Sequence, residues 1–375
     1  MVALFWGAII SIAYVYFGYP AILFLLSLRQ GHEAKPNKGY SPAVTLIITA
    51  QNEAKRIRKK LENTLEIEYP EHKLEVIVAS DASTDATDDI VRMYASKGIR
   101  LVRAPERRGK EFAQKCALKQ ATGEIIVFSD VATILERDGI SRIVSNFADP
   151  SVGCVSSEDR FIDEQGHISG EGAYVQYEMW LRSIETRVNS VVGLSGSFFA
   201  ARKDMCSNWP SDIPSDFNTL LNSIRSGYRG ISDSRSVGIY TNIKDQSREF
   251  ERKVRTITRG ISALMANKGL LSPFRYGLFS WQLISHKLLR WLVPWLLVIA
   301  ICANVFLAVR RGIYQLILVP HVLFYVLGCF GPSLAESKII VRLPYFFIQF
   351  NRAIAVAWVS YLRGERFITW MPSNR

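Results

Sequence analysis

Long uncharged apolar runs near both ends of this chain constrain its fold more than any other sequence feature. Residues 1–28 contain no charged side chain. Because about 20 apolar residues cross the hydrocarbon core of a bilayer as a helix, we predict an N-terminal transmembrane helix over residues 1–28. A cleaved signal peptide is the alternative, but this run lacks a preceding basic segment and is longer than the apolar part of such a peptide.

Two more uncharged runs, residues 292–309 and 312–335, flank Arg310 and Arg311. Each is too long for an ordinary core helix, so we predict a transmembrane hairpin over residues 291–335. We predict an interfacial or fourth membrane helix and a C-terminal tail over residues 336–375. Arg352 lies near the centre of that apolar stretch, where a charge is costly unless it is paired or lines a cavity.

Most charged side chains lie between these runs. The sequence predicts a linker over 29–43, a cytoplasmic globular domain over 44–268, and an amphipathic interfacial helix over 269–290, for which a buried core helix is the alternative. Lys and Arg follow the first span and none precedes it. This bias predicts a multi-pass protein of the cell (inner) membrane with the N-terminus outside, although Arg310 and Arg311 argue weakly for the opposite orientation.

The formal charge of +12 suits a protein that lies against anionic headgroups and handles a pyrophosphate, but basic residues also simply solvate a surface. We expect contact with membrane lipids and no nucleic acid partner.

Strand and helix patterns alternate in the first half of the globular domain. We predict strands over 44–50, 74–80, 99–103 and 124–129, and helices over 53–65, 85–94 and 110–120. This alternation indicates an α/β fold with a mainly parallel sheet covered on both faces. Neither a Gly-x-Gly-x-x-Gly motif nor a phosphate-loop motif follows any of these strands, which argues against hydride transfer and ATP hydrolysis.

Polar residues follow three of the predicted strands, at the edge where open α/β sheets bind ligands. They are Gln51, Asn52 and Glu53 after the first strand, Asp81, Ser83 and Asp85 after the second, and Asp130 after the fourth. We expect Asp81 to stand exposed and to bind a base or ribose, and Asp130 to hold a divalent cation that bridges diphosphate oxygens. Asp85 has a structural alternative, as the cap of the next helix.

Two features lie farther along the chain. Asp216 falls at a predicted helix N-terminus, where it is either a cap or a general base that deprotonates an acceptor hydroxyl. Arg252, Arg255 and Arg259 share one face of a predicted helix. That face either contacts lipid headgroups or clamps a leaving diphosphate.

In this order, the motifs resemble those of the membrane-bound family 2 glycosyltransferases, which have the GT-A nucleotide-sugar fold and include bacterial polysaccharide and exopolysaccharide synthases. The resemblance runs from Thr45 to Arg375. The matching segments are Ala50–Glu53, Asp81–Asp85, Arg108–Glu111, Ser129–Thr133, Leu194–Ala200, Pro214–Phe217 and Lys253–Thr256.

The resemblance implies a GT-A-type, Rossmann-like domain flanked by transmembrane helices, and it implies roles for individual residues. Asp216 would be the catalytic base of an inverting transfer, Arg252 and Arg255 would bind the diphosphate, and Asp130 would hold Mg²⁺ or Mn²⁺. A loop of Ser195, Gly196 and Ser197 would contact the donor or acceptor sugar. The implied nucleotide-binding residues are Ala50, Asn52, Glu53, Asp81, Ser83, Lys110 and Asp130.

Three positions depart from the family pattern. Ala132 stands where a second polar metal ligand is usual, and Ser215 stands where another acid commonly precedes the base. The Gln-x-x-Arg-Trp motif of processive synthases is absent, and Lys253–Thr256 occupies its region. The absence of this motif and the small number of spans favour a single addition over processive extension.

We therefore predict a hexosyltransferase that moves a sugar from a nucleotide diphosphate sugar, UDP-linked, to a lipid-linked saccharide or polysaccharide acceptor in cell-surface polysaccharide synthesis. Two alternatives remain open. One is a transferase that loads sugar directly onto polyprenyl phosphate. The other is a catalytically silent nucleotide-binding membrane scaffold.

Overall fold

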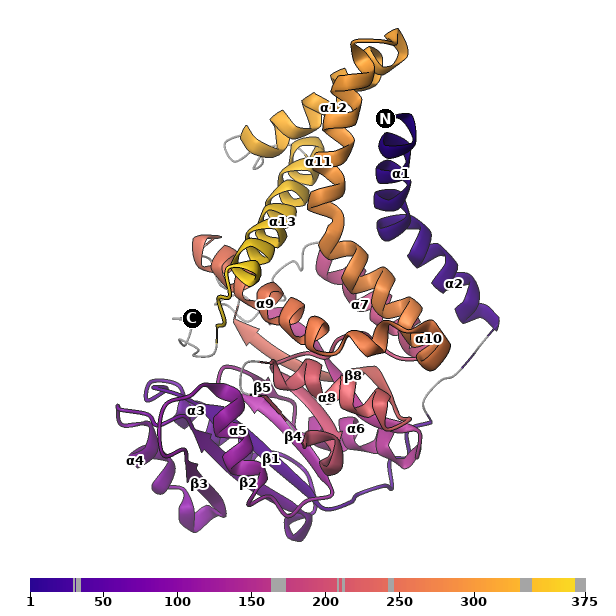
Figure 1. The fold of residues 1–375 in the computed structure, drawn as a ribbon. Coiled ribbons are helices and arrows are strands. Elements are labelled where there is room, and N and C mark those ends of the chain that lie inside the picture. The colour runs from indigo at the N-terminus through magenta and orange to yellow at the C-terminus, as the bar shows by residue number, and fades with distance from the viewer. Residues whose placement is uncertain are drawn as a thin grey trace. The chain divides into compact units, whose positions relative to one another are not determined.

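The computed structural model describes residues 1–29, 31, 35–162, 173–207, 209–210, 213–241, 246–330 and 339–367 (Figure 1). The chain divides into two compact units. We call them the helical unit, which comprises Met1–Leu25, Asp245–Ile261 and Ser280–Arg366, and the sheet unit, which comprises Leu26–Lys244, Ser262–Phe279 and Phe367–Arg375.

The sheet unit contains, among its described residues, an eight-stranded sheet in the order β3-β2-β1-β4-β7-β6-β8-β5. β1, β2, β3 and β4 are mutually parallel, as are β6 and β8, whereas β7 runs antiparallel to β4 and β6, and β5 runs antiparallel to β8. The predicted mixed, mainly parallel sheet is confirmed. The strands are β1 Val44–Ala50, β2 Leu74–Ser80, β3 Ile99–Arg103, β4 Ile125–Asp130, β5 Ile134–Leu135, β6 Val152–Ile162, β7 Phe198–Arg202 and β8 Arg229–Thr241.

Helices cover both faces of this sheet. One face of β1 carries apolar side chains, and the other carries both apolar and polar side chains. Val44, Leu46 and Ile48 are fully buried against α3, α4 and α6. On the opposite face, Thr49 accepts a hydrogen bond from Gln114 of α5 (3.1 Å). The helices of this unit are α3 Ile57–Leu65, α4 Thr87–Arg92, α5 Lys110–Leu118, α6 Gly139–Ser145, α7 Ala173–Val188 and α8 Ser215–Arg225.

The strand register brings the predicted site residues to one edge. Ala50 pairs with Ser80, Thr49 pairs with Asp130, and Ser129 pairs with Phe198 of the antiparallel β7. The segments that follow β1, β2 and β4, and the segment that precedes β7, therefore meet at the carboxyl ends of the parallel strands.

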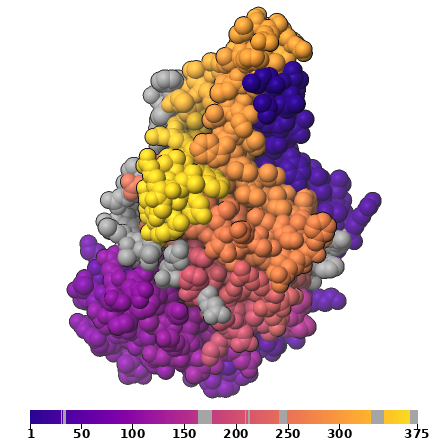
Figure 2. Space-filling model, viewed as in Figure 1, coloured from indigo at the N-terminus to yellow at the C-terminus, as the bar shows by residue number. Residues whose placement is uncertain are grey.

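The helical unit contains, in the part of the chain that is described, three helices that are long and apolar enough to cross a membrane: Val2–Arg29, Pro273–Ala308 and Gly312–Cys329. Its elements are α1 Val2–Ala13, α2 Tyr19–Arg29, α9 Gln246–Ala266, α10 Pro273–Leu283, α11 Leu289–Ala308, α12 Gly312–Phe330 and α13 Ile339–Leu362, some of which extend into the sheet unit. In Figure 2, α13 (yellow) packs beside α11 and α12 (orange).

One segment differs from its prediction as a separate interfacial helix. α10 is followed without a gap by a π-helical turn, Ile284–Leu288, and then by α11. A bend remains at Gly277, whose φ of 51° lies outside the helical region.

Candidate active site

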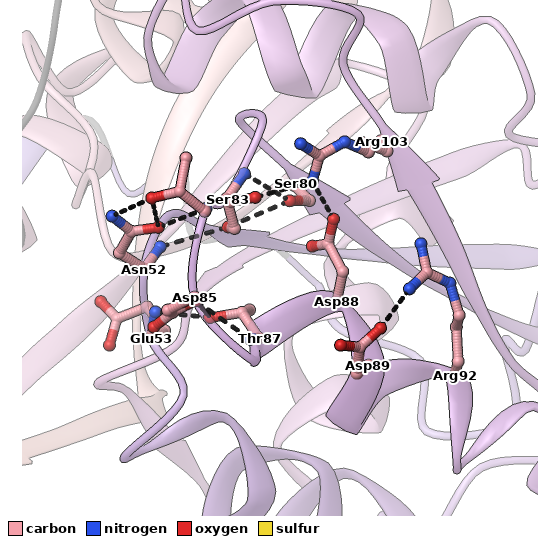
Figure 3. A network of polar contacts seen from close by, with 11 residues as sticks. Asn52, Glu53, Ser80, Ser83, Asp85, Thr87, Asp88, Asp89, Arg92 and Arg103 are labelled. Atoms are coloured by element: carbon pink, nitrogen blue, oxygen red, sulfur yellow. Dashed lines mark hydrogen bonds and ion pairs between the residues drawn. The ribbon is translucent and has the colours of Figure 1, made fainter.

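The turns after β1 and β2 hold each other through side chains (Figure 3). The backbone of Asn52 has a φ of 52°, and its side-chain carbonyl accepts a hydrogen bond from the Thr84 backbone (2.8 Å). Asn52 also donates its backbone N–H to the hydroxyl of Ser83 (3.2 Å). The predicted nucleotide-binding residues Asn52 and Ser83 thus form one rigid surface.

Asp85 follows the structural alternative, because it fixes the start of α4. Its carboxylate accepts hydrogen bonds from the backbone N–H groups of Thr87 and Ala54, both at 3.0 Å. Burial alone would raise the pKa of Asp85, but these bonds and one from the Thr87 hydroxyl outweigh it, and the pKa is lowered.

Glu53 is a buried carboxylate at the end of β1. It is 3% exposed and accepts two hydrogen bonds from Arg56, at 2.7 and 2.8 Å. Burial raises the pKa of Glu53 and outweighs the opposing effect of Arg56. The helix predicted from Glu53 begins only at Ile57, and residues 54–56 form a turn before it.

The expectation that Asp81 stands exposed is wrong. Asp81 is 1% exposed, and its carboxylate accepts hydrogen bonds from the backbone N–H groups of Arg108 (3.0 Å) and Gly109 (2.9 Å). Gly109 has a φ of 98°, a conformation that glycine adopts without strain. Asp81 therefore shapes the turn that presents Lys110 at the first position of α5.

Lys110 connects two other predicted elements. Its ammonium lies 2.5 Å from Oδ1 of Asp130 and 2.7 Å from the carbonyl oxygen of Gly196. The backbone N–H of Asp130 in turn donates to the carbonyl of Ser197 (3.0 Å). The structure thus brings the strand-end acid, the lysine and the predicted sugar loop together.

A cation at this site would depend on Asp130. The described residues contain no group of three His, Cys, Asp or Glu side chains suited to a metal, in keeping with Ala132. The Asp130 side chain is 29% exposed, and within the described chain only its Oδ1 is engaged in a side-chain contact. One free carboxylate oxygen fits Mg²⁺ or Mn²⁺ at a phosphate site, where substrate phosphates and waters supply the other ligands.

Asp216 lies in the first turn of α8, where the helix dipole stabilises negative charge. A Cβ atom built on Gly196 would lie 3.2 Å from Oδ2 of Asp216. The candidate base therefore lies beside the same loop residue whose carbonyl binds Lys110.

We predict that Gly196→Ala lowers kcat, because the added methyl group displaces the carboxylate of Asp216 by a few tenths of an ångström. A misplacement approaching 1 Å costs on the order of 100-fold in rate, so we expect a loss of about tenfold, with little change in donor KM. Gly139→Ala is the control, since a Cβ there meets no atom within 4 Å. Equal kcat values for Gly196→Ala and Gly139→Ala would show that Gly196 does not affect the position of Asp216.

Sequence reasoning missed a polar cluster beneath the sugar loop. The Ser195 hydroxyl donates to Asp159 (2.5 Å) and lies 3.0 Å from the Ser197 hydroxyl, which lies 3.1 Å from the Tyr240 hydroxyl. Tyr240 also donates to Asp159, and burial and Asp159 hold its pKa well above the usual range. Asp159 and Tyr240 thus fix the side chains on either side of Gly196.

Lys60 was also missed. It is completely buried on α3, and its ammonium donates to the Ser129 hydroxyl (2.7 Å) and the Thr133 carbonyl (2.6 Å). Burial lowers the pKa of Lys60 to about 7, although the nearby Asp130 opposes that shift. Lys60 joins the two ends of the turn that contains Asp130.

The lowered pKa of Lys60 predicts a pH-dependent stability. The unfolded chain retains a proton on this lysine up to about pH 10.4, whereas the folded chain releases it near pH 7. Between these values the unfolded state binds more protons, so this residue makes the free energy of unfolding rise with pH. Thermal unfolding of the detergent-solubilised protein from pH 6.5 to 9.5 should show that rise weakened in Lys60→Met and kept in the exposed control Lys59→Met. Parallel curves for all three proteins would contradict the assignment.

Arg252 and Arg255 lie on α9 in the helical unit. Arg252 bonds twice to Glu249, at 2.8 and 2.9 Å. Their diphosphate role stays a prediction.

Comparison with known sequences decides the class of this protein. Residues 45–208 match the family described as "Glycosyl transferase family 2". These residues form a family 2 glycosyltransferase domain. The match spans the strands β1 to β7 and every site element described above except Asp216, Tyr240 and the α9 arginines. The match confirms the resemblance to family 2, the GT-A fold and the glycosyltransferase class that the order of the motifs indicated.

Several family 2 relatives are similar over part of the chain. Poly-beta-1,6-N-acetyl-D-glucosamine synthase of Staphylococcus aureus is 26% identical over 220 residues, which cover 56% of this chain and 52% of that protein. Beta-monoglucosyldiacylglycerol synthase of Nostoc is 26% identical over 197 residues, covering 50% and 42%. The chain thus spans about half the length of these relatives.

One solved structure is similar over nearly the whole chain. It is a mannosyltransferase from Pyrobaculum calidifontis in complex with GDP-Man and Mn²⁺, with a TM-score of 0.75 and 26% identity. The similarity covers 97% of this chain and 100% of that chain. It includes the helices outside the sheet unit as well as the sheet.

Proposed function

We propose that this protein transfers one sugar, with inversion at the anomeric carbon, from a nucleoside diphosphate sugar to a lipid-linked saccharide at the bilayer surface. The observation that carries the proposal is that Lys110 bonds to both Asp130 and Gly196, while Asp216 lies beside Gly196. This set combines a carboxylate and an ammonium for the diphosphate side with a second carboxylate for the acceptor side.

The chemistry follows from these groups. Asp216 would accept the proton of the acceptor hydroxyl while that oxygen bonds to the anomeric carbon and the bond to the diphosphate breaks. Lys110 would offset charge on the departing diphosphate, which is where most of the rate gain arises. A divalent cation held by Asp130 would supply Lewis-acid stabilisation of the same charge. We assign Arg252 and Arg255 to the diphosphate on the resemblance alone.

The donor is proposed to be UDP-linked, with the nucleoside at the strand ends and turns that contain Ala50, Asn52, Glu53, Asp81 and Ser83, of which Asn52 alone is exposed. The similar mannosyltransferase was solved with GDP-Man, so both nucleosides belong in the test. A glycolipid synthase among the relatives supports a lipid-bound acceptor.

We also propose that the protein is a multi-pass cell-membrane enzyme with the sheet unit in the cytoplasm. Three candidate spans and the Lys and Arg residues after the first one support this arrangement. A cytoplasmic sheet unit gives the site access to cytosolic nucleotide sugars.

The test uses the full chain in detergent, a panel of UDP- and GDP-linked sugars, Mg²⁺ or Mn²⁺, and membrane lipid extract. Free nucleoside diphosphate is measured. We expect release from one donor only, dependent on lipid extract. Bare polyprenyl phosphate and lipid-linked saccharide as separate acceptors distinguish direct loading of the carrier from the proposed transfer. No release from any donor would favour the silent scaffold.

A further inference from the structure

α13 carries a charge, Arg352, and the acidic residues of the helix that contacts it, Glu249 and Glu251 of α9, form no recorded ion pair with it among the described residues. α11, α12 and α13 contain no Asp or Glu. Arg352 is exposed, and in the described part of the chain its recorded side-chain contact is with the ring of Phe250, 5.4 Å from the guanidinium. An ionisable residue in a membrane-spanning bundle requires an anion, a cavity or water.

A cavity lies beside this arginine. It is an open groove between α11, α12 and α13 with a volume of about 500 Å³. Its lining includes Leu297, Val298 and Ile301 of α11, Val322 and Val326 of α12, and Arg352 of α13. The walls are apolar, and the volume falls within the range of 300–1,000 Å³ that is typical of ligand pockets. A hydrocarbon chain fits such a lining better than a sugar does.

The position of Arg352 along α13 suits the headgroup of a lipid. Five residues farther on, Ala357 accepts a hydrogen bond from Thr258 of the basic helix α9 (3.4 Å). The next residue, Trp358, donates to the carbonyl of Trp291 near the start of α11 (2.8 Å). Arg352 is thus about 7.5 Å along α13 from the Ala357–Thr258 contact, and its guanidinium contacts Phe250 near the start of α9. The apolar lining extends away from that end, to Ile301.

We propose that this cavity binds the acceptor lipid, with its phosphate on Arg352 and its hydrocarbon chain between α11, α12 and α13. The ligand class is a long-chain lipid phosphate or diphosphate. A guanidinium binds phosphate through paired, charge-assisted hydrogen bonds, and the apolar walls bury the chain. This inference deepens the proposed function, because it rests on the acceptor being lipid-linked.

The experiment measures binding of radiolabelled polyprenyl monophosphate to the full chain in phosphatidylcholine nanodiscs. We expect Arg352→Gln to weaken binding by about tenfold or more, as loss of a charge-assisted hydrogen bond implies, and Arg352→Lys to restore most of it. Ala355→Phe, which fills the cavity, should weaken binding in the same way. Arg310→Gln and Val305→Trp are the matched controls, since neither residue lines the cavity, and both should bind as wild type does.

Two outcomes would overturn the proposal. Equal binding by wild type and Arg352→Gln would remove the arginine from the site, and equal displacement by phosphatidylglycerol would make the cavity a site for bulk anionic lipid. Nucleotide-sugar binding is measured on the same samples. Wild type that binds the lipid phosphate but no nucleotide sugar would count against the proposed function alone, whereas retained sugar binding in Arg352→Gln shows that the variant is folded.

Discussion

Asp216→Asn is expected to abolish sugar transfer while donor binding is retained. Loss of a positioned general base typically costs about 10²- to 10⁴-fold in rate. The amide keeps the size of the carboxylate and its place beside Gly196, so the loop and the start of α8 should be preserved. The loss should therefore appear in kcat, with the donor dissociation constant changed by less than about threefold.

The measurement is the release of nucleoside diphosphate under saturating donor and acceptor, with equilibrium binding of the donor measured separately. Glu71→Gln is a matched control, because Glu71 is exposed and precedes β2, at the opposite edge of the sheet. Wild-type turnover by Asp216→Asn would show that Asp216 is not the catalytic base.

Asp130→Asn is expected to have the second largest effect. The substitution removes the negative charge that pairs with Lys110 at 2.5 Å and the carboxylate proposed to hold the cation. Loss of one group that organises the stabilisation of developing charge costs about 10²- to 10³-fold in kcat. We also expect the Mn²⁺ concentration at half-maximal activity to rise, since an amide oxygen is a weaker ligand for a hard cation.

Asp89→Asn is the control for this charge change. Asp89 is exposed on α4 and pairs with Arg92 at 2.5 Å, and such surface pairs contribute about 0–1 kcal/mol. An unchanged Mn²⁺ requirement in Asp130→Asn would show that Asp130 does not hold a cation.

The first four strands of the sheet could be predicted because each has a clear local sequence pattern. The apolar strand β1 and the acids after β1, β2 and β4 mark both the strand ends and the ligand-binding edge, since parallel strands end at the same side. β7 and the long strands β6 and β8 were not predicted. Their pairings are between segments distant in the sequence, and no periodicity within a single strand reveals such partners.

The site was predictable in its residue types and less so in its contacts. Lys60 lies three residues after Ile57 and next to Leu61, on the buried stripe of α3, but charged residues are rarely buried, so this spacing does not predict the burial of a lysine. Asp81 was expected to face solvent, yet the turn before α5 folds over it. Asp159 and Tyr240 join through tertiary contacts across 81 residues, which one sequence does not disclose.

The most direct test of the account is the anomeric configuration of the product, determined by proton NMR after incubation with a donor of defined configuration. An inverted linkage to the acceptor, formed by wild type and lost in Asp216→Asn, is the result that a single displacement assisted by Asp216 predicts. A product that retains the donor configuration would contradict this mechanism, because a single displacement inverts the configuration at the anomeric carbon.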